Sequence, residues 1–377
     1  MPRIAETLFA LGAGLVALAP WQTGWAETFS LQKASFEAVV LTDNLDHPWG
    51  MAFLPDGRML VSEREGRLRM VSAQGELSDP LSGLPEVFDQ GQGGLLDVAL
   101  HPDFAANGLV YFTYSQPDGD GARTALARGR LDGMSLRDVE TIFAAGNLAS
   151  GGRHFGSRIV FAPDCTIYMT AGERGDARQA QNLKTQNGTV IRLNDDGSVP
   201  PDNPFVGPTG TPPTTYTFGH RNPQGMAVHP ITGEVWVHEH GPQGGDEINL
   251  LKPGANYGWP IVTFGKSYAG FPIGEGTSKP GMEPPLHHWT PSIAPSGMAF
   301  YTGDAFPAWK GNLFVGSLKF AYLARLELDG ARVISEERLL EDEFGRVRDV
   351  RQGPDGLLYI LTDESDGSLV RLQPTGG

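Results

Sequence analysis

Residues 224–240 read QGMAVHPITGEVWVHEH, in which two apolar segments flank a turn that contains proline and glycine. Both segments alternate in the way of a β-strand, so the stretch predicts a strand, a tight turn and a second strand. The pattern returns five more times along the chain. The other copies are WGMAFLPDGRMLVSE (49–63), LLDVALHPDFAANGLVYFTYS (95–115), SRIVFAPDCTIYMTAGE (157–173), SGMAFYTGDAFPAWKGNLFVGS (296–317) and VRDVRQGPDGLLYILTD (347–363).

Six copies of one strand–turn–strand unit indicate a repeat fold. The turn prolines Pro55, Pro102, Pro163 and Pro230 lie 47 to 67 residues apart, which leaves room for two further strands in each unit. Units of four strands at this spacing are typical of propeller blades. We therefore predict an all-β fold, a six-bladed β-propeller of four-stranded blades. A pair of β-sandwiches is the alternative, but it does not predict six copies of one motif.

The N-terminus has the features of a secretory signal peptide. Arg3 precedes an apolar run from Leu8 to Ala19, and Gly24 and Ala26 are small residues at the positions expected before a cleavage site. The apolar run is shorter than the roughly 20 residues that span a membrane, so cleavage after Ala26 is preferred over a membrane anchor. The expected mature chain, residues 27–377, is then one catalytic propeller domain in the periplasm, with no later membrane span.

The composition argues against several kinds of function. The formal net charge is -15, whereas nucleic-acid binding needs a basic face, so no nucleic-acid partner is expected. The 50 glycines and 29 prolines fit a turn-rich β-fold. Cys165 is the only cysteine, which excludes an intramolecular disulfide, and its place in a Pro-Asp turn does not favour a catalytic thiol.

Polar residues recur at one position of the repeat, next to the strand ends. Equivalent loops of all blades meet at one mouth of a propeller, so these residues can form one site although they are distant in sequence. The residues at these positions are Gln92, His154, Arg221, Asn222, Gln224, Lys319, Arg346 and Arg348. Each has a structural explanation when taken alone, but their shared register favours a common site. Four of them are cations in an acidic chain, which indicates a bound polyanion with carboxylates.

The stretch HEHGPQGGDE (238–247) suggests a metal site. Its Gly-Pro turn exposes the carbonyl oxygens of Gly241 and Pro242, and the carboxylates of Asp246 and Glu247 follow. Hard oxygen donors of this kind suit Ca²⁺. The two histidines that open the stretch suggest Zn²⁺ instead, but no third ligand accompanies them at a conventional spacing. Ca²⁺ is therefore preferred, and a chain without a metal is the remaining alternative.

Seven segments carry a resemblance to a known family. They are HPWGMAFLPDGRMLVSEREG, GQGGLLDVALHPDF, GHRNPQG, EHGPQGGDEIN, NYGWP, WTPSIAPSGMAFY and RVRDV. Together they resemble the soluble aldose sugar dehydrogenases that depend on pyrroloquinoline quinone (PQQ), which form the glucose/sorbosone dehydrogenase family of six-bladed propellers. The resemblance covers about residues 35 to 373. It implies oxidation of an aldose at C1 to the lactone, with PQQ and Ca²⁺ as cofactors.

The resemblance also implies roles for single residues. His154 resembles the general base that takes the proton of the C1 hydroxyl, and Glu173 stands where glucose dehydrogenases have an aspartate that orients this base. Arg221 resembles the arginine that polarises the quinone, and Gln92 the glutamine beside the sugar. The cations that hold the cofactor's carboxylates, and the contacts that support them, are implied to be Lys319, Arg346, Arg348, Asn222 and Gln224.

Two metal sites are implied in the same way. The carbonyls of Gly241 and Pro242 resemble the protein ligands of the catalytic Ca²⁺, and Asp246, Glu247 and Tyr257 match a region that binds structural Ca²⁺. Other positions depart from the glucose enzymes, which have an aspartate in place of Arg153 and a glutamine in place of His240. A preference for glucose is therefore not implied.

Other functions and partners follow from the same residues. Ca²⁺-dependent propellers also hydrolyse lactones, but they bind the metal with side chains in the channel and need no group of cations. A propeller that binds a ligand without catalysis is the third reading. We expect an aldose as the small-molecule substrate, a periplasmic electron acceptor, and a monomer or homodimer. Specificity is expected in the loops 116–123 and 265–285, where no periodicity is present.

Overall fold

The computed structural model describes residues 26–30, 34–146 and 148–375. The predicted signal peptide lies outside this part apart from Ala26, so its cleavage stays a prediction. Within the described ranges, no helix is long and apolar enough to cross a membrane. Three short helices are present there, namely α1 (Phe104–Asn107) and the 3₁₀ turns η1 (Ala177–Gln181) and η2 (Pro307–Trp309).

The repeated motif forms the first two strands of a sheet, as predicted. Residues 224–240 contain β14 (Pro223–Val228) and most of β15 (Val235–Glu239). The turn between them is closed by hydrogen bonds from His229 N to Glu234 O (2.8 Å) and from Gly233 N to His229 O (2.9 Å). Gly233 has a φ of +73°, a conformation that glycine adopts without a steric penalty.

The strands group into six sheets in chain order. The first sheet holds β3 (Pro48–Phe53), β4 (Met59–Glu63) and β5 (Arg67–Val71). The second holds β6 (Leu95–Leu100), β7 (Leu109–Asp118), β8 (Gly121–Asp132) and β9 (Ser135–Ala144). The third holds β10 (Ile159–Phe161), β11 (Ile167–Ala171), β12 (Thr189–Leu193) and β13 (Thr215–Phe218).

The remaining sheets complete the set. The fourth adds β16 (Asp246–Leu250) and β17 (His287–Trp289) to β14 and β15. The fifth holds β18 (Pro295–Phe300), β19 (Leu313–Ser317), β20 (Tyr322–Asp329) and β21 (Arg332–Leu339). The sixth holds β22 (Val347–Gln352), β23 (Leu358–Thr362), β24 (Gly367–Pro374), β2 (Ser35–Leu45) and β1 (Ala26–Ser30).

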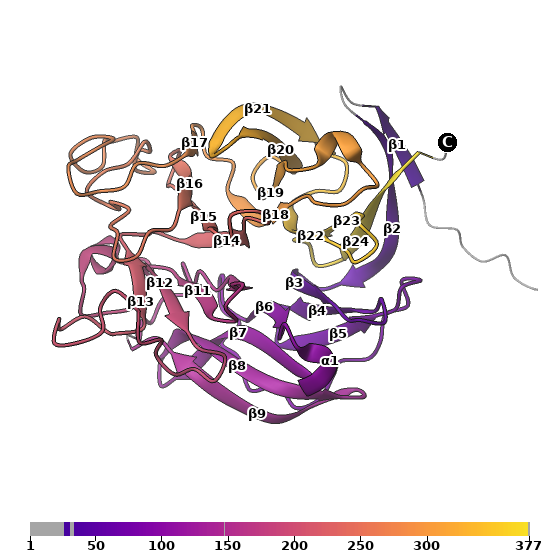
Figure 1. The fold of residues 1–377 in the computed structure, drawn as a ribbon, viewed down its shortest axis with the longest axis horizontal. Coiled ribbons are helices and arrows are strands. Elements are labelled where there is room, and N and C mark those ends of the chain that lie inside the picture. The colour runs from indigo at the N-terminus through magenta and orange to yellow at the C-terminus, as the bar shows by residue number, and fades with distance from the viewer. Residues whose placement is uncertain (1–25, 31–33, 147, 376–377) are drawn as a thin grey trace, which may run out of the picture.

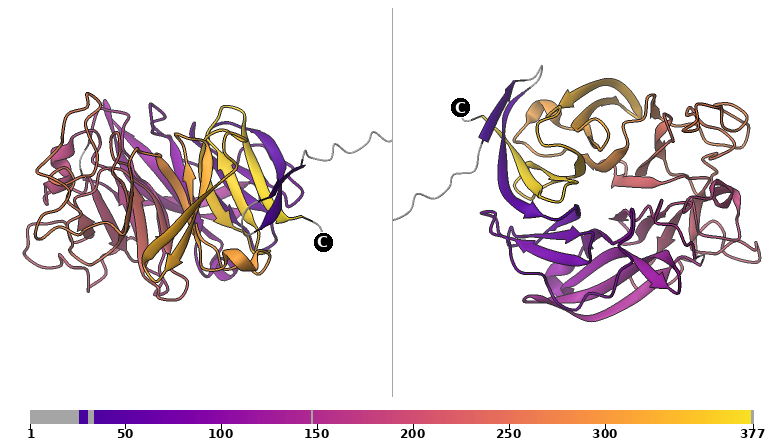
Figure 2. Two further views of the ribbon diagram at one scale, coloured as in Figure 1. Left: turned by 90° about the horizontal axis from the view of Figure 1, so that it is seen from above. Right: turned by 180° about the vertical axis from the view of Figure 1, so that it is seen from behind.

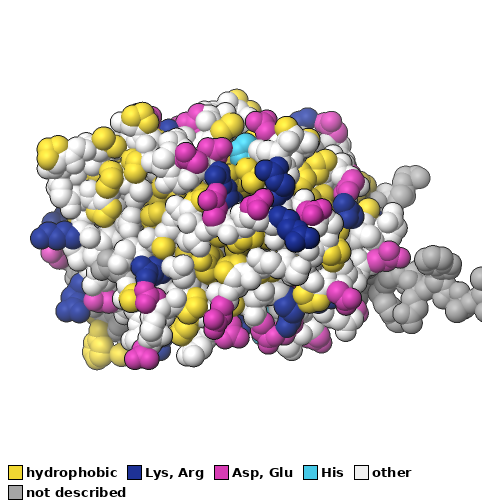
Figure 3. Space-filling model, turned by 90° about the horizontal axis from the view of Figure 1, so that it is seen from below, with side chains coloured by type: hydrophobic (Ala, Val, Ile, Leu, Met, Phe, Trp, Pro, Cys, Tyr) yellow, Lys and Arg dark blue, Asp and Glu magenta, His cyan; other side chains and the backbone are white. Residues whose placement is uncertain are grey.

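The six sheets stand as blades around a central axis (Figures 1 and 2). The first strand of each blade faces the axis and contacts the first strand of the next blade, from β3 through β6, β10, β14, β18 and β22 back to β3. The predicted six-bladed propeller is confirmed. Seen from below, the outer side of the ring shows acidic and basic side chains interspersed rather than one broad basic surface (Figure 3).

Two blades differ from the predicted four strands. The first blade has three strands and the sixth has five, in the order β1-β2-β24-β23-β22. The sixth blade takes its extra strands from the N-terminus, because β2 pairs antiparallel with β24 over partners such as Val39 and Arg371. The N-terminal strands β1 and β2 and the C-terminal strand β24 therefore share one sheet, and this pairing closes the ring.

Apolar side chains fill every interface between neighbouring blades. One cluster joins Met51 and Val61 of the first blade to Tyr359 and Leu361 of the sixth. Comparable clusters lie between the other five pairs of blades. The second strands, such as β11 and β15, are buried along their whole length, as expected for strands covered on both faces.

A network of charged side chains occupies the centre of the ring. Arg158 Nη1 lies 3.0 Å from Asp97 Oδ1 and 3.1 Å from Asp349 Oδ1. Arg351 contacts the same two carboxylates at 2.8 and 2.9 Å. Arg158, Asp97 and Asp349 are at most 1% exposed. The network therefore joins the second, third and sixth blades by buried ion pairs.

We expect Asp97→Asn to lower the free energy of unfolding by about 3–5 kcal/mol, because it leaves the charges of Arg158 and Arg351 with the single carboxylate of Asp349. Urea denaturation of the purified protein measures the loss. The control is Asp132→Asn, which removes a surface partner of Arg137 that is 68% exposed and should cost less than about 0.5 kcal/mol. A loss at Asp97 no larger than at Asp132 would contradict a stabilising role for the central network.

Candidate active site

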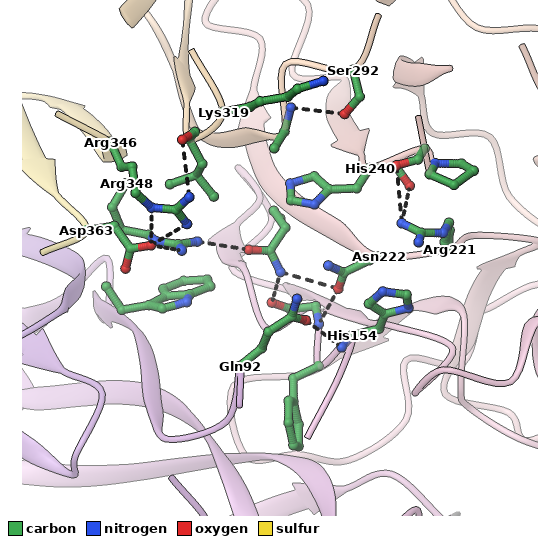
Figure 4. Close-up of a pocket in the computed structure, with 18 of the residues that line it drawn as sticks. Gln92, His154, Arg221, Asn222, His240, Ser292, Lys319, Arg346, Arg348 and Asp363 are labelled. Atoms are coloured by element: carbon green, nitrogen blue, oxygen red, sulfur yellow. Dashed lines mark hydrogen bonds and ion pairs between the residues drawn. The ribbon is translucent and has the colours of Figure 1, made fainter. Parts of the chain in front are cut away.

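A cavity of about 800 Å³ opens at one mouth of the propeller, where loops of all six blades meet. Its volume lies in the upper part of the ~300–1,000 Å³ range typical of small-molecule sites. The predicted residues in its wall are Gln92, His154, Arg221, Asn222, Gln224, Gly241, Pro242, Lys319, Arg346 and Arg348. Figure 4 shows most of them around one space. The structure thus brings the residues of one repeat register together, as predicted.

His154 and Glu173 form a hydrogen-bonded pair at the cavity. The two residues precede β10 and follow β11, and His154 Nδ1 lies 2.7 Å from Glu173 Oε1. An ionised carboxylate only accepts hydrogen bonds, so Nδ1 carries the proton and Nε2 is left as the basic nitrogen. Glu173 does not line the cavity itself. Its longer side chain, compared with an aspartate, still reaches the imidazole.

The backbone around His154 is shaped for this position. His154 has a φ of +54°, which is uncommon for a residue with a side chain. Its backbone nitrogen donates to Gln92 Oε1 at 2.7 Å. A Cβ on Gly172 would lie only 2.2 Å from the carbonyl oxygen of His154, so this approach requires glycine. Strain of this kind is characteristic of functional sites.

Burial and charge set the protonation of His154. Burial lowers the pKa of its imidazole below 6.5, and the charge of Arg221 lowers it further, while the hydrogen bond to Glu173 opposes both. The imidazole is therefore neutral at neutral pH and free to accept a proton. A neutral base with a fixed tautomer is what general base catalysis requires.

Arg221 is held over the Gly-Pro turn. Its Nη1 donates to the carbonyl oxygens of His240 (3.1 Å) and Gly241 (3.3 Å), and its guanidinium lies 5.4 Å from the centre of the Trp259 ring. Glu239 accepts the backbone N–H of Arg221 at 2.5 Å. These contacts keep a positive charge next to the Gly241 carbonyl, which is one of the two carbonyls predicted to bind the catalytic Ca²⁺.

Asp363 forms ion pairs with two of the predicted cations. Its Oδ2 lies 2.8 Å from Arg346 Nη2 and 2.7 Å from Arg348 Nη2. Burial alone would raise the pKa of this carboxyl, but Arg348 and Arg346 lower it to about 2. Asp363 was not among the predicted site residues. The signal was present, because it ends the second strand of the sixth copy of the repeat.

Polar contacts link these cations to the fourth blade. Arg348 Nη1 donates to Gln224 Oε1 at 3.1 Å, and Gln224 Nε2 lies 3.3 Å from Asn222 Oδ1. Asn222 in turn accepts the N–H of Gly156 at 3.2 Å. Asn222 and Gln224 therefore connect the arginines to the loop of His154 (Figure 4).

Asp246 does not line the cavity, but its carboxylate holds the loops that do. Its carboxylate accepts four hydrogen bonds, from Gly241 N (2.7 Å), Ser292 Oγ (2.9 Å), Ile293 N (2.7 Å) and Ala294 N (3.0 Å). Burial raises its pKa to about 6. The carboxylate thus holds the Gly-Pro turn in place, and the sequence did not distinguish this role from that of a ligand.

Glu247 and Tyr257 border a small pocket together with Glu239 and Trp259. Burial raises the pKa of Glu247 well above its ordinary value, and the charge of Glu239 raises it further. The Tyr257 hydroxyl is committed to Leu250 O (2.6 Å) and Lys252 N (2.9 Å). Only Glu247 therefore offers a side chain here that a cation would stabilise.

The structure gives the Zn²⁺ alternative no support. Among the described residues, no group of three or more His, Cys, Asp or Glu side chains could hold a metal ion. His240 lines the cavity, but its Nε2 is 2.5 Å from the carbonyl oxygen of Pro295. Burial lowers the pKa of His238 to about 3, and this residue lies outside the cavity wall.

The two predicted specificity loops differ in position. Tyr268, within residues 265–285, lines the cavity, whereas no residue from 116 to 123 does. Residues 116–123 lie in the hairpin between β7 and β8, with Gln116 opposite Arg123.

Comparison with known proteins identifies similar chains. Residues 45–371 match the family model described as Glucose / Sorbosone dehydrogenase. Aldose sugar dehydrogenase YliI of Escherichia coli is 46% identical over 90% of this chain and 94% of its own. Quinoprotein glucose dehydrogenase B of Acinetobacter calcoaceticus is 30% identical over 89% of this chain and 88% of its own.

Solved structures extend the similarity. The apo form of the soluble aldose sugar dehydrogenase of Escherichia coli has a TM-score of 0.88 at 45% identity, over 90% of this chain and all of its own. The PQQ-bound form of the aldose sugar dehydrogenase of Streptomyces coelicolor has a TM-score of 0.75 at 30% identity, over 94% of this chain and 99% of its own.

We expect the imidazole of His154 to titrate below pH 6.5, with NMR of the histidine ring protons as the measurement. Glu173→Gln should shift the midpoint further down, because Glu173 raises this pKa, and Arg153→Gln should shift it up, because Arg153 lowers it. The unfolded chain then takes up this proton more readily than the folded one, so stability decreases as the pH falls below 6.5. An upward shift in Glu173→Gln would contradict the assigned pairing.

Proposed function

Because the chain belongs to the glucose/sorbosone dehydrogenase family, we propose that it oxidises aldose sugars at C1 to the lactone with PQQ as the hydride acceptor. Family membership confirms the predicted enzyme class, a quinone-dependent sugar oxidoreductase. The observation that carries the proposal is one cavity that combines the His154–Glu173 pair with four cations, Arg221, Lys319, Arg346 and Arg348.

The cavity wall has donors suited to a tricarboxylate cofactor. Arg348 Nε is buried without a hydrogen-bond partner, and a ligand carboxylate would satisfy it. Lys319 Nζ contacts the Phe320 ring at 4.9 Å, and no ion pair to it is found within the described residues. Guanidinium and ammonium groups that the protein leaves partly unsatisfied favour binding of anionic oxygens. Lys319, Arg346 and Arg348 are the residues that would hold PQQ.

The Gly241–Pro242 turn is the proposed site of the catalytic Ca²⁺. Gly241 and Pro242 line the cavity beside Arg221, and Asp246 fixes their turn from behind. Neutral carbonyl donors are ordinary Ca²⁺ ligands, with the remaining ligands supplied by the cofactor or water. When bound, PQQ accepts the hydride and Ca²⁺ acts as a Lewis acid at its oxygens.

His154 performs the proton transfer in this scheme. As the hydride leaves C1, the C1 hydroxyl loses its proton to His154 Nε2 and the C1–O bond becomes a carbonyl. Glu173 holds Nδ1–H and stabilises the imidazolium that forms. Because the hydroxyl proton and the hydride leave together, the sugar loses two electrons and two hydrogens, which gives the lactone.

Arg221 and Gln92 complete the proposed arrangement. The buried guanidinium of Arg221 would supply positive charge to the acceptor as negative charge develops on it, and such preorganised charges stabilise a transition state without reorganisation. Gln92 uses its Oε1 to hold the backbone of His154, which leaves its amide Nε2 to a sugar hydroxyl. Gln92 thereby positions the base and can contact the substrate.

A second Ca²⁺ is proposed at Glu247. Two carboxylates, Glu239 and Glu247, are buried near each other, and Glu239 is already paired with His220 at 2.7 Å. Within the described part of the chain, the only hydrogen bond to the Glu247 carboxylate is the 3.5 Å contact from Asn249 Nδ2. A cation bound at Glu247 would relieve the repulsion between the two carboxylates. This site would stabilise the fold and take no part in the reaction.

The competing functions fit the cavity less well. A hydrolase that binds Ca²⁺ through side chains needs carboxylates around the channel, and no such cluster occurs in the described ranges. A binding module would have no use for a buried neutral histidine oriented by a glutamate. Export to the periplasm, a periplasmic electron acceptor and a monomer or homodimer complete the proposal.

With Ca²⁺ and PQQ added to the purified apoprotein, we expect aldose-dependent reduction of a dye that is absent without the quinone. His154→Ala should lower kcat by about 10²- to 10⁴-fold, the usual size of a general base contribution, with PQQ affinity little changed. The control is His47→Asn, which removes a carboxylate-paired histidine outside the cavity and should retain activity. Full activity in His154→Ala, or no quinone binding at all, would contradict the proposal.

Removal of Ca²⁺ with a chelator should lower the melting temperature of the quinone-free protein, and Glu247→Gln should abolish this dependence. At a Ca²⁺ concentration 100-fold above Kd the expected stabilisation is about 2.7 kcal/mol. Calorimetry with and without Ca²⁺ measures it. Glu234→Gln, at an exposed carboxylate on the same blade, serves as the control. Equal Ca²⁺ dependence in Glu247→Gln and wild type would exclude the second site.

A further inference from the structure

Arg174 is a buried arginine of the third blade that has no carboxylate partner. It lies just after the end of β11 and is 5% exposed. Within the described residues its guanidinium forms no ion pair, whereas the buried Arg192 of the same blade pairs with Asp164 and Asp202. Burial lowers the pKa of Arg174 to about 10, so the side chain stays charged at neutral pH. A buried charge without a counter-ion is costly, so the role of this side chain lies in its other contacts.

These contacts go to the loop that carries His154. Arg174 Nη2 donates to the carbonyl oxygen of Gly151 at 2.7 Å, and Nη1 donates to the carbonyl oxygen of Arg153. Residues 150–158 form no helix or strand, so their carbonyl groups need partners from other parts of the chain. The planar guanidinium has its donors in a rigid fork, and it therefore holds these two carbonyls in one fixed arrangement.

Arg174 also contacts the residue that follows His154. Its guanidinium lies 3.4 Å from the centre of the Phe155 ring, and Phe155 is buried and lines the cavity. The loop is thus held at residues 151, 153 and 155, on both sides of the proposed base. Arg174 itself has a φ of +63°, which is uncommon for a residue with a side chain. Strained conformations of this kind cluster at functional sites.

We propose that Arg174 is a positioning residue that fixes the loop 151–155 and thereby keeps the imidazole of His154 against Glu173. The two neighbours divide the task, because Glu173 accepts the Nδ1–H of His154, while Arg174 holds the backbone of the loop. Arg174 does not line the cavity, so it touches neither the sugar nor the quinone and acts through His154. The inference rests on the proposed function.

Arg174→Lys keeps the charge but loses the fork, so the loop should loosen. In the Ca²⁺- and PQQ-loaded enzyme we expect kcat to fall about 10- to 100-fold, the effect of a displacement of about 1 Å at a catalytic group, while KM and PQQ affinity stay close to those of the wild type. The matched control is Arg192→Lys, at a buried arginine outside the cavity wall, which should lower stability without lowering kcat. Arg174→Gln removes the buried charge and tests the same prediction if lysine is not tolerated at this position.

A double-mutant cycle shows whether Arg174 acts through His154. In the His154→Ala background, Arg174→Lys should change the residual activity by less than about twofold, because residues that act as a unit are not additive. A merely structural role of Arg174 would lower the activity of both backgrounds by the same factor.

A measurement without the cofactor separates this inference from the proposed function. NMR of the quinone-free protein follows the exchange of the His154 Nδ1–H with water. Loss of the loop contacts exposes this proton more often, so we expect exchange to be about tenfold faster in Arg174→Lys and unchanged in Arg192→Lys. Absence of aldose oxidation in the wild type would overturn the proposed function, while the exchange still tests Arg174. Unchanged exchange in the Arg174 variants, or the same loss of kcat in both backgrounds of the cycle, would overturn the inference.

Discussion

Two arginines and two aspartates meet at the axis of the ring, and the architecture around the cavity depends on them. Asp97 and Asp349 each face both Arg158 and Arg351, and they project from the innermost strands of the second and sixth blades. Unpaired charges at such a place would be costly. The blades must therefore keep their registers for the pairs to form. The same strands begin at the cavity, so the network also sets where the wall residues stand.

At the cavity, in contrast to the axis, the positive charges are not fully neutralised by carboxylates. Arg346 immediately precedes β22 and Arg348 lies near its start, and a single oxygen of Asp363 contacts both. Their repulsion is only partly relieved, and Arg348 Nε stays unsatisfied. A site of this kind is incomplete in the absence of an anion. At the axis, arginine and aspartate charges cancel, and they serve the fold. At the cavity, positive charge exceeds negative charge, and this excess is available to a ligand.

Much of this arrangement could be predicted from the sequence, for a specific reason. The strand–turn–strand unit has a local sequence signal at every copy. In a propeller, residues at equivalent positions of the repeats lie at the same mouth of the ring. His154, Arg221 and Lys319 could therefore be assigned to one site without knowledge of any contact. Roles decided by side-chain direction could not be predicted. Asp246 and Glu247 are neighbours in sequence and were expected to share a metal site, yet Asp246 accepts hydrogen bonds from the backbone of residues 241, 293 and 294 and from the hydroxyl of residue 292. Likewise, the place of β2 in the last blade has no counterpart in the repeat.

The closure of the ring has a consequence for biosynthesis. Strand β2 leaves the ribosome early, but its partner β24 is among the last segments to be made. The sixth blade therefore cannot assemble during translation, and the nascent propeller must wait with an open sheet edge. Open edges invite pairing with other chains. A protein built in this way depends on keeping its early strand apart from other nascent chains until β24 has been made, and loss of β24 would leave β2 without its partner in the last blade.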